Sequence, residues 1–183
     1  MLEVRSTALE DVLEVRPRRI GDERGFFSEV WNRAAWGAAG LPDVEFVQDN
    51  HSRSARGVLR GLHYQLTPAA QAKLVRVSRG SVFDVVVDIR RASRSFGRWV
   101  GLTLSAAEWN QVFVPAGFAH GFLALEHDSE VQYKVTFPYS AEHDRSIRPD
   151  DPAIGIDWPL PGVQRLLSAK DRAAPLLVDA ELP

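Results

Sequence analysis

Two short segments of the chain carry side chains that together could move a proton at a carbon atom. Segment 57–80 contains His63 and Lys73, and segment 114–122 contains His120. A histidine can remove a proton near neutral pH, and an ammonium ion stabilises the enolate oxygen that forms when a carbon beside a ketone loses its proton. A tyrosine hydroxyl can return a proton from the other side. These residue types therefore predict proton abstraction alpha to a ketone.

The spacing of these residues resembles the two motifs of the cupin superfamily. In metal-binding cupins, a glycine precedes a His-x-His pair, a glutamate and a second glycine, and a Pro-x-Gly-x-x-His motif follows. The matching positions here are Gly57, His63, Gly80, Pro115, Gly117 and His120. The resemblance implies an all-β fold, a small cupin or jelly-roll β-barrel whose inward side chains line one pocket.

The usual set of metal ligands is incomplete in this pattern. Gln65 replaces the second histidine, and Lys73 stands where the glutamate would be. A protonated lysine repels a divalent cation and cannot ligate it. We therefore expect a pocket without a metal, in which Lys73 serves as a fixed positive charge.

Short strands must position these side chains. Stretches rich in β-branched residues recur at intervals of about ten residues, separated by turn sequences, as in an antiparallel sandwich or barrel. The predicted strands are Leu74–Ser78, Ser81–Arg90, Trp99–Leu104, Gln111–Pro115 and Val131–Thr136. Two short helices are expected, at Glu29–Gly40 and near Gly162–Ala169. The stretch Arg148–Gly162, rich in proline and aspartate, is expected to be ordered coil over the surface, anchored by Trp158.

The composition is typical of one soluble globular domain covering residues 1–183. The formal net charge of −2 disfavours a general role in nucleic-acid binding. The chain has no cysteine, which excludes disulfides and thiolate chemistry and fits a reducing cytosol. It shows neither a signal-peptide pattern nor an apolar run of about 18 residues. We therefore expect a cytoplasmic protein that binds neither nucleic acid nor a membrane.

Eight segments, in order along the chain, carry a more specific pattern. They are Asp22–Glu29, Gln48–Ser52, Gly57–Gln65, Lys73–Val77, Phe96–Trp99, Pro115–Phe122, Tyr133–Lys134 and Leu167–Asp171. Together they resemble the dTDP-4-dehydrorhamnose 3,5-epimerase family, without large gaps, over residues 10–177. The cupin pattern alone is weaker, because cupins host many unrelated functions.

The resemblance implies inversion at C3 and C5 of dTDP-4-dehydro-6-deoxy-D-glucose, which gives dTDP-4-dehydro-L-rhamnose. His63 is then the general base, held by Asp171. Tyr133 is the general acid on the opposite face, and Lys73 stabilises the enolate. No cofactor is needed, because the ketone of the substrate is the electron sink.

The resemblance also implies a set of substrate-binding residues and a homodimer. The binding residues are Arg24, Phe27, Glu29, Gln48, Asn50, Arg60, His120, Tyr139, Asp144 and Lys170. The first three are expected to serve the site of the partner subunit. An extended N-terminal segment could also add to the sheet edge of a neighbour.

Three positions depart from the pattern of the family. The sequence has Phe137-Pro138-Tyr139 where an aromatic pair is frequent, Asp144 where glutamate is frequent, and Pro149 where tryptophan is frequent. These positions lie near the expected nucleotide end of the site. They bear on substrate binding rather than on the chemistry.

Other interpretations of the sequence stay open. A relative that inverts only one carbon could share the same base and acid. A metal-dependent cupin is disfavoured by Gln65 and Lys73, and a non-catalytic nucleotide-sugar-binding protein is disfavoured by the acid and base set. Singly, His63 could be a buried structural histidine, Lys73 a strand-edge charge and Asp171 a helix cap.

Overall fold

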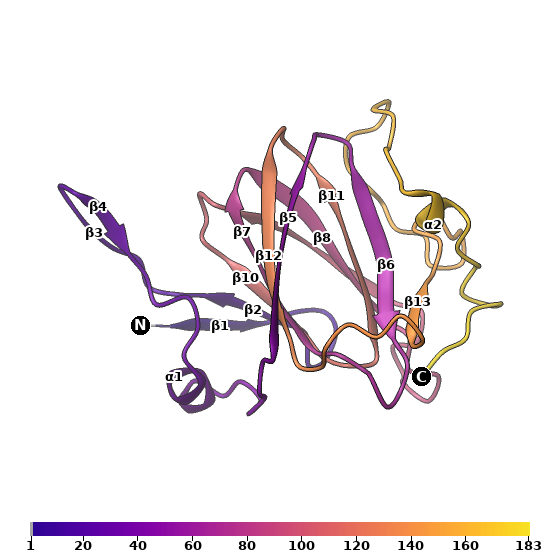
Figure 1. The fold of residues 1–183 in the computed structure, drawn as a ribbon, viewed down its shortest axis with the longest axis horizontal. Helices are drawn as coiled ribbons and strands as arrows, with labels where there is room; N and C mark the ends of the chain where they lie inside the picture. Colours follow the sequence, from indigo (N-terminus) through magenta and orange to yellow (C-terminus); the bar gives the residue numbers. More distant parts are fainter. Residues whose placement is uncertain (1) are drawn as a thin grey trace.

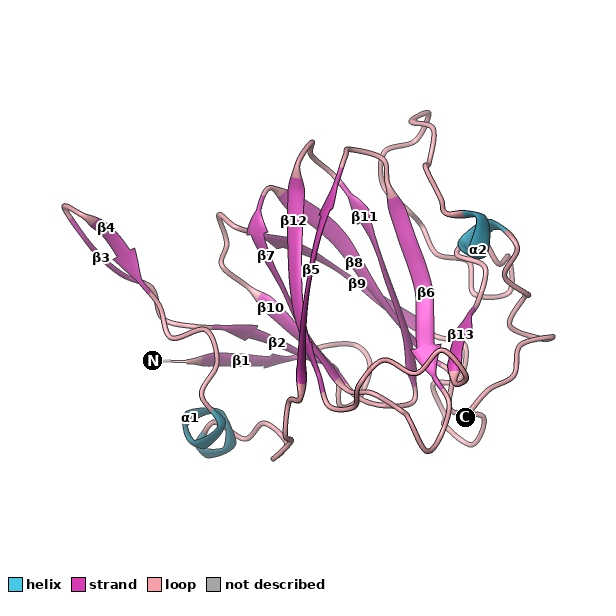
Figure 2. Ribbon diagram, viewed as in Figure 1, coloured by secondary structure: helices cyan, strands magenta, loops and turns pink. Residues whose placement is uncertain are grey.

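Two antiparallel β-sheets face each other in the computed structural model, which describes residues 2–183 (Figure 1). The six-stranded sheet has the order β1-β2-β10-β7-β12-β5, and the five-stranded sheet has the order β13-β6-β11-β8-β9. The strands are β1 (Glu3–Ser6), β2 (Leu13–Arg16), β3 (Ile20–Asp22), β4 (Gly25–Phe27), β5 (Gln48–Ser54), β6 (Leu59–Gln65), β7 (Lys73–Arg79), β8 (Ser81–Asp88), β9 (Trp99–Ser105), β10 (Gln111–Val114), β11 (Phe118–Ala124), β12 (Ser129–Val135) and β13 (Asp144–Ser146). Strands dominate the molecule, and the all-β jelly-roll prediction is confirmed (Figure 2).

The five predicted strands correspond to β7, β8, β9, β10 and β12, with ends that differ by at most two residues. Runs of β-branched side chains identified them, because such side chains fit a pleated and largely buried surface. β5 was not predicted, since its sequence, QDNHSRS, is entirely polar. It is a strand because all seven of its residues are in register with β12.

Alternation along the strands fills the space between the sheets with apolar side chains. Val82 and Val86 of β8 pack there with Val75 and Val77 of β7 and with Val131 of β12. These residues come from both sheets, so they join the two layers into one barrel. The polar site described below interrupts this apolar interior.

The outer face of the five-stranded sheet is covered by the C-terminal segment. Trp158, Leu177 and Ala180 are buried against the outward side chains of β8, Val85 and Val87. The indole N–H of Trp158 donates to the carbonyl of Pro149, at 2.8 Å. The prediction of an ordered coil anchored by Trp158 is confirmed.

The two helices differ from their predicted ranges. Helix α1 (Arg33–Ala38) begins later than predicted, because the Asn32 side chain caps it by accepting from the N–H of Ala35. The helix predicted at Gly162–Ala169 is wrong. There, Leu166 exchanges backbone hydrogen bonds with Gly57 and Leu59, which keeps the chain extended. The second helix, α2 (Ala169–Arg172), starts only after its N-cap, Ser168.

A small hairpin, β3–β4, projects away from the two sheets (Figure 1). All six of its residues are exposed, including Phe26 and Phe27. Its two strands pair only with each other among the described residues. Within residues 2–183, none of the helices combines the length and apolar character needed to cross a membrane.

Candidate active site

His63 and His120 are register partners on neighbouring strands, β6 and β11. The two strands approach closely beside them, where a glycine on each strand faces the other. A Cβ atom on Gly121 would lie 2.7 Å from the carbonyl oxygen of Arg60, and one on Gly61 would lie 2.5 Å from the Cα of Gly121. Both glycines are therefore required for the spacing that brings the two imidazoles into one site.

His63 forms a hydrogen bond with a buried carboxylate. Its Nε2 atom lies 2.6 Å from Oδ1 of Asp171, whose side chain is 3% exposed. Burial acts to raise the pKa of Asp171, but hydrogen bonds from His63 and from the backbone N–H of Gly61 outweigh it and leave the pKa lowered. An ionised Asp171 accepts the Nε2 proton, so Nδ1 is the basic nitrogen of neutral His63.

Lys73 is buried on β7, and its Nζ atom donates to the carbonyl oxygen of His63 at 3.4 Å. Burial lowers its pKa from 10.5 to about 8, while attraction by Asp84 and Asp144 acts in the opposite direction. Lys73 therefore carries its charge at neutral pH although it is enclosed. A charge in such a place acts strongly on any anion that forms beside it.

Tyr133 lies on β12, in register with Asn50 of β5 and Val75 of β7. Burial raises the pKa of its phenol. The hydroxyl thus keeps its proton at neutral pH and can donate it. Tyr133 belongs to the six-stranded sheet and His63 to the five-stranded sheet, so the two residues come from opposite walls of the barrel.

Two adjoining cavities, of about 520 and 410 Å³, contain these side chains. Asn50, His63, Lys73, Tyr133 and Lys170 line both cavities, which are therefore parts of one site. The other predicted residues that line one of them are Gln48, Arg60, His120, Tyr139, Asp144 and Asp171. The structure thus gathers into one place residues that span more than a hundred positions of the chain, from 48 to 171.

Asp144 connects two other predicted binding residues in the second cavity. Its Oδ2 atom accepts a hydrogen bond from the hydroxyl of Tyr139, at 3.1 Å. The same atom forms an ion pair with the ammonium of Lys170. The hydrogen bond to Asp144 raises the pKa of Tyr139. Gln48 accepts from the backbone N–H of Tyr139 and donates to Asn50. The cluster combines an exposed aromatic ring with a lysine cation.

Arg60 is held near the opposite end of the site. Its guanidinium donates to the hydroxyl of Ser54, at 3.1 Å, and to the carbonyl of Arg53, at 3.2 Å. Together with Lys73 and Lys170, it places three cations on the wall of the larger cavity. Three cations around one cavity suit a ligand with negative charge.

Three predicted binding residues lie apart from the cavities of their own chain. Arg24 pairs with Asp22 on the hairpin, and the Phe27 side chain is 69% exposed. Glu29 is also exposed, and it accepts from the Asn32 side chain. None of the three lines the two cavities that hold His63. Their predicted role in a partner's site stays a prediction.

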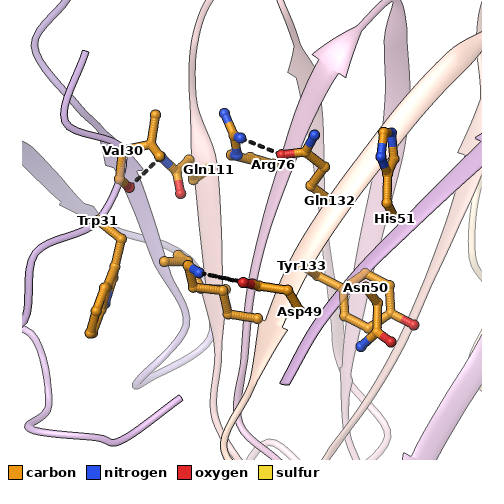
Figure 3. Close-up of a pocket in the computed structure, with 11 residues that line it drawn as sticks. Val30, Trp31, Asp49, Asn50, His51, Arg76, Gln111, Gln132 and Tyr133 are labelled. Carbon is orange, nitrogen blue, oxygen red and sulfur yellow. Dashed lines mark hydrogen bonds and ion pairs between the residues drawn. The ribbon is translucent and has the colours of Figure 1, made fainter. Parts of the chain in front are cut away.

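A third cavity, of about 320 Å³, lies over the other face of the six-stranded sheet (Figure 3). Its walls include Trp31, Arg76 and Gln111, and an ion pair joins Asp49 to Lys134. Except for Asn50, His51 and Tyr133, its lining residues are absent from the cavities around His63. His63, Lys73 and Asp171 do not line it, so we assign the chemistry to the site inside the barrel.

The buried residue Asp84 was not predicted as part of the site from the sequence. Asp84 is completely buried on β8 and accepts a hydrogen bond from Nε2 of His120, at 2.8 Å. The signal was present in the sequence, because Asp84 is an acid within the apolar run 82–87 of a predicted strand. Acidic side chains are almost never fully buried unless they are paired.

The chain is similar to known sugar-nucleotide epimerases over nearly its whole length. The model of a family described as dTDP-4-dehydrorhamnose 3,5-epimerase matches residues 6–179. An enzyme of that name from Pseudomonas aeruginosa is 53% identical over 174 residues, which cover 95% of each chain. A dTDP-6-deoxy-D-glucose-3,5-epimerase from Legionella pneumophila, solved with dTDP-4-keto-L-rhamnose, has a TM-score of 0.96 and 45% identity, covering 100% of this chain and 98% of its own. A 3′-monoepimerase from Streptomyces bikiniensis, solved with dTDP-quinovose, has a TM-score of 0.89 and 35% identity, covering 94% and 86%.

Proposed function

The chain belongs to the dTDP-4-dehydrorhamnose 3,5-epimerase family, and from this membership we propose how its cavity inverts C3 and C5 of dTDP-4-dehydro-6-deoxy-D-glucose. The protein is an isomerase, and the product is dTDP-4-dehydro-L-rhamnose. Both carbons flank the C4 ketone. Each can therefore lose its hydrogen as a proton while the C–H electrons move toward the ketone oxygen.

One observation carries the proposal: His63 and Tyr133 lie on opposite sheets and line the same cavity between them. Inversion requires that a proton leave one face of a carbon and return to the other face. A base on one wall and a neutral phenol on the opposite wall suit these two steps. A protein that only binds a sugar nucleotide has no need of such a pair.

In the proposed reaction, Nδ1 of His63 takes the proton, and the C–H electrons form the carbon–carbon double bond of an enolate. The C4 oxygen gains negative charge, which the ammonium of Lys73 stabilises. Tyr133 then donates its proton to the opposite face, and the ketone forms again. Solvent returns a proton to the phenolate and takes one from the imidazolium. The same steps follow at the second carbon.

The remaining lining residues are proposed to hold the sugar nucleotide. Arg60 and Lys170 are cations suited to the diphosphate, and Tyr139 offers an exposed ring for the base. Gln48, Asn50 and His120 supply hydrogen-bonding groups for the sugar. Asp144, where the family pattern frequently has glutamate, is the shorter carboxylate that Lys170 and Tyr139 contact.

We further propose that the chain acts as a single domain and as a homodimer in the cytoplasm. The β3–β4 hairpin projects from the two sheets (Figure 1). It supports the dimer, because its aromatic side chains are exposed in one chain. Arg24, Phe27 and Glu29 would then act on the site of the partner. The absence of cysteine is compatible with a reducing compartment.

Uptake of deuterium from solvent tests the proposal directly. Purified protein treated with a chelator is incubated with dTDP-4-dehydro-6-deoxy-D-glucose in heavy water, and label at C3 and C5 is measured by NMR. We expect label at both carbons and its loss in His63→Ala. The His143→Ala variant is a matched control, because it removes an imidazole that is also partly exposed but is absent from the lining of the cavities.

Each other outcome leads to a different interpretation. Label at one carbon only would identify a single-site epimerase, like the relative that is described as a 3′-monoepimerase. Absence of label together with tight binding of the sugar nucleotide would contradict the catalytic proposal and favour a binding protein.

A further inference from the structure

Asp84 is a carboxylate enclosed in the apolar interior of the barrel. It lies on the inward face of β8 between Val82 and Val86, both of which belong to the core between the sheets. Its side chain has no exposure to solvent. Burying a charged group is unfavourable unless nearby charges and hydrogen bonds compensate, so the presence of Asp84 requires an explanation.

The hydrogen bonds of Asp84 compensate this burial only in part. Oδ2 accepts from Nε2 of His120, at 2.8 Å, whereas Oδ1 has no hydrogen-bond partner within residues 2–183. Asp88, four residues along the same strand and equally buried, is the contrasting case. It accepts from the Arg90 guanidinium and from the hydroxyls of Ser93 and Ser95. Loop residues thus satisfy both oxygens of Asp88, whereas one oxygen of Asp84 bonds to His120 and the other has no partner within residues 2–183.

Asp84 also acts on Lys73. Among the charged groups that influence this ammonium, Asp84 stabilises the charged form most, Asp144 adds to the effect, and Lys170 opposes it. The ionisable side chains of His63, Tyr133 and His120 line the same cavity as Lys73. Because burial strongly disfavours the ammonium, a fixed negative charge nearby decides how far the lysine stays protonated.

We propose that Asp84 is a positioning residue of the epimerase site, which orients the imidazole of His120 and keeps Lys73 in its ammonium form. The proposal rests on the proposed function, in which Lys73 stabilises the enolate. By accepting the Nε2 proton, Asp84 fixes the tautomer of neutral His120 and leaves Nδ1 as its acceptor nitrogen. One buried carboxylate thus prepares two groups that line the cavity.

The first test measures Lys73 itself and needs no turnover. Lys73, Lys134 and Lys170 are the only lysines of the chain, so protein labelled with ¹³C at lysine Cε gives three resolvable signals. In wild type we expect Lys73 to titrate at about pH 8. In Asp84→Asn the midpoint should fall by about one unit or more, as expected when an opposite charge is removed nearby.

Two variants control this titration. Asp88→Asn removes an equally buried carboxylate from the same strand and should leave the midpoint of Lys73 where it is in wild type. If Asp84→Asn does not fold, the smaller Asp84→Ser carries the same measurement. An unchanged Lys73 midpoint in a folded Asp84 variant would overturn the proposal.

The second test follows the pH dependence of kcat. In Asp84→Asn the alkaline limb should move to lower pH by the same amount as the lysine titration, while the affinity for dTDP changes by no more than about twofold. A merely structural role would lower kcat at every pH without moving the limb. If wild type shows no deuterium uptake, the proposed function fails. If wild type is active and the limb stays in place, only the role of Asp84 fails.

Discussion

The Nε2 atom of His63 lies 2.6 Å from Oδ1 of Asp171, a residue 108 positions later in the chain. The base therefore depends on a carboxylate that a separate element, α2, supplies from outside the sheet. Asp171→Asn should lower kcat by about 10²- to 10⁴-fold, because an amide neither fixes the tautomer nor stabilises the imidazolium. Steady-state kinetics with dTDP-4-dehydro-6-deoxy-D-glucose measures the effect.

Ala169→Gly is the matched control for Asp171→Asn. It weakens α2 at an exposed residue that lines neither cavity, keeps the carboxylate, and should cost about 1 kcal/mol of stability with a small effect on kcat. Equal losses of activity in both variants would mean that the helix, and not the charge of Asp171, matters.

Tyr133→Phe should separate the two halves of the reaction. The variant keeps the ring and loses the hydroxyl, so His63 can still remove the proton and return a deuteron to the same face. In heavy water we expect label in the substrate with retained configuration, and a fall in product formation of about 10²-fold or more. Simultaneous loss of label would show instead that Tyr133 is needed for proton abstraction.

Lys73→Met should make the protein more stable and much less active. The shift of the Lys73 pKa from 10.5 to about 8 corresponds to roughly 3 kcal/mol. Because the folded pKa of this cation is lower than the unfolded one, burial costs stability below pH 8, and the cost declines between pH 8 and 10.5. Urea unfolding at pH 7 should therefore show a gain of roughly 1–3 kcal/mol for the variant.

The same gain should shrink when both proteins are unfolded at pH 10.5, where the lysine is neutral in the folded protein and about half neutral in the unfolded chain. A less stable Lys73→Met protein at pH 7 would mean that the ammonium contributes to folding. Loss of activity in the more stable protein would instead place the contribution of Lys73 in the reaction.

Gly121→Ala should separate the two histidine strands. The added Cβ would lie 2.7 Å from the carbonyl oxygen of Arg60, which is backbone and cannot turn aside. We expect a loss of about 1–3 kcal/mol in the free energy of unfolding and a lower kcat, both from displacement of β6 against β11. The control is Gly37→Ala in α1, where nothing lies within 4 Å of the added atom. That substitution should leave kcat unchanged.

Mixing two inactive variants tests whether the hairpin completes the site of a partner. One variant carries His63→Ala, and the other carries Arg24→Ala with Phe27→Ala. If the hairpin acts across a dimer, random exchange of subunits should restore up to about a quarter of wild-type activity, because each heterodimer has one intact site. If the hairpin serves its own chain, every site in the mixture lacks one component and activity stays absent.

The strands that could be predicted from the sequence are those whose own side chains favour extended backbone. β8 is such a strand, since its β-branched side chains favour extended backbone wherever the strand is placed. β5 and the extended chain at Leu166 were missed, because their structure comes from hydrogen bonds with β12 and with Gly57 and Leu59. Such partners cannot be inferred from a short window of sequence.

In the candidate site, too, some residues carry a signal in the local sequence and others are recognised only from the family or the fold. The spacing of His63, Lys73 and His120 marks them as a set, and strands from both sheets of one barrel present them to the same cavity. Asp171 and Tyr133 carry no local signal and were predicted only through family resemblance. Asp84 carried a signal, an acid in an apolar strand, but its partners lie on other strands, and only the fold reveals them.

The position of Asp171 also sets an order of events during synthesis of the chain. Both sheets are complete in sequence once Ser146 has been added, whereas Asp171 follows twenty-five residues later. A chain that ended after the two sheets would contain His63 but not the carboxylate that orients it. Burial of Trp158 and Leu177 on the outer face of the five-stranded sheet holds the late segment in place. Because Leu166, Lys170 and Asp171 also line the larger cavity, the cavity and the base are completed together by the last part of the chain to be made.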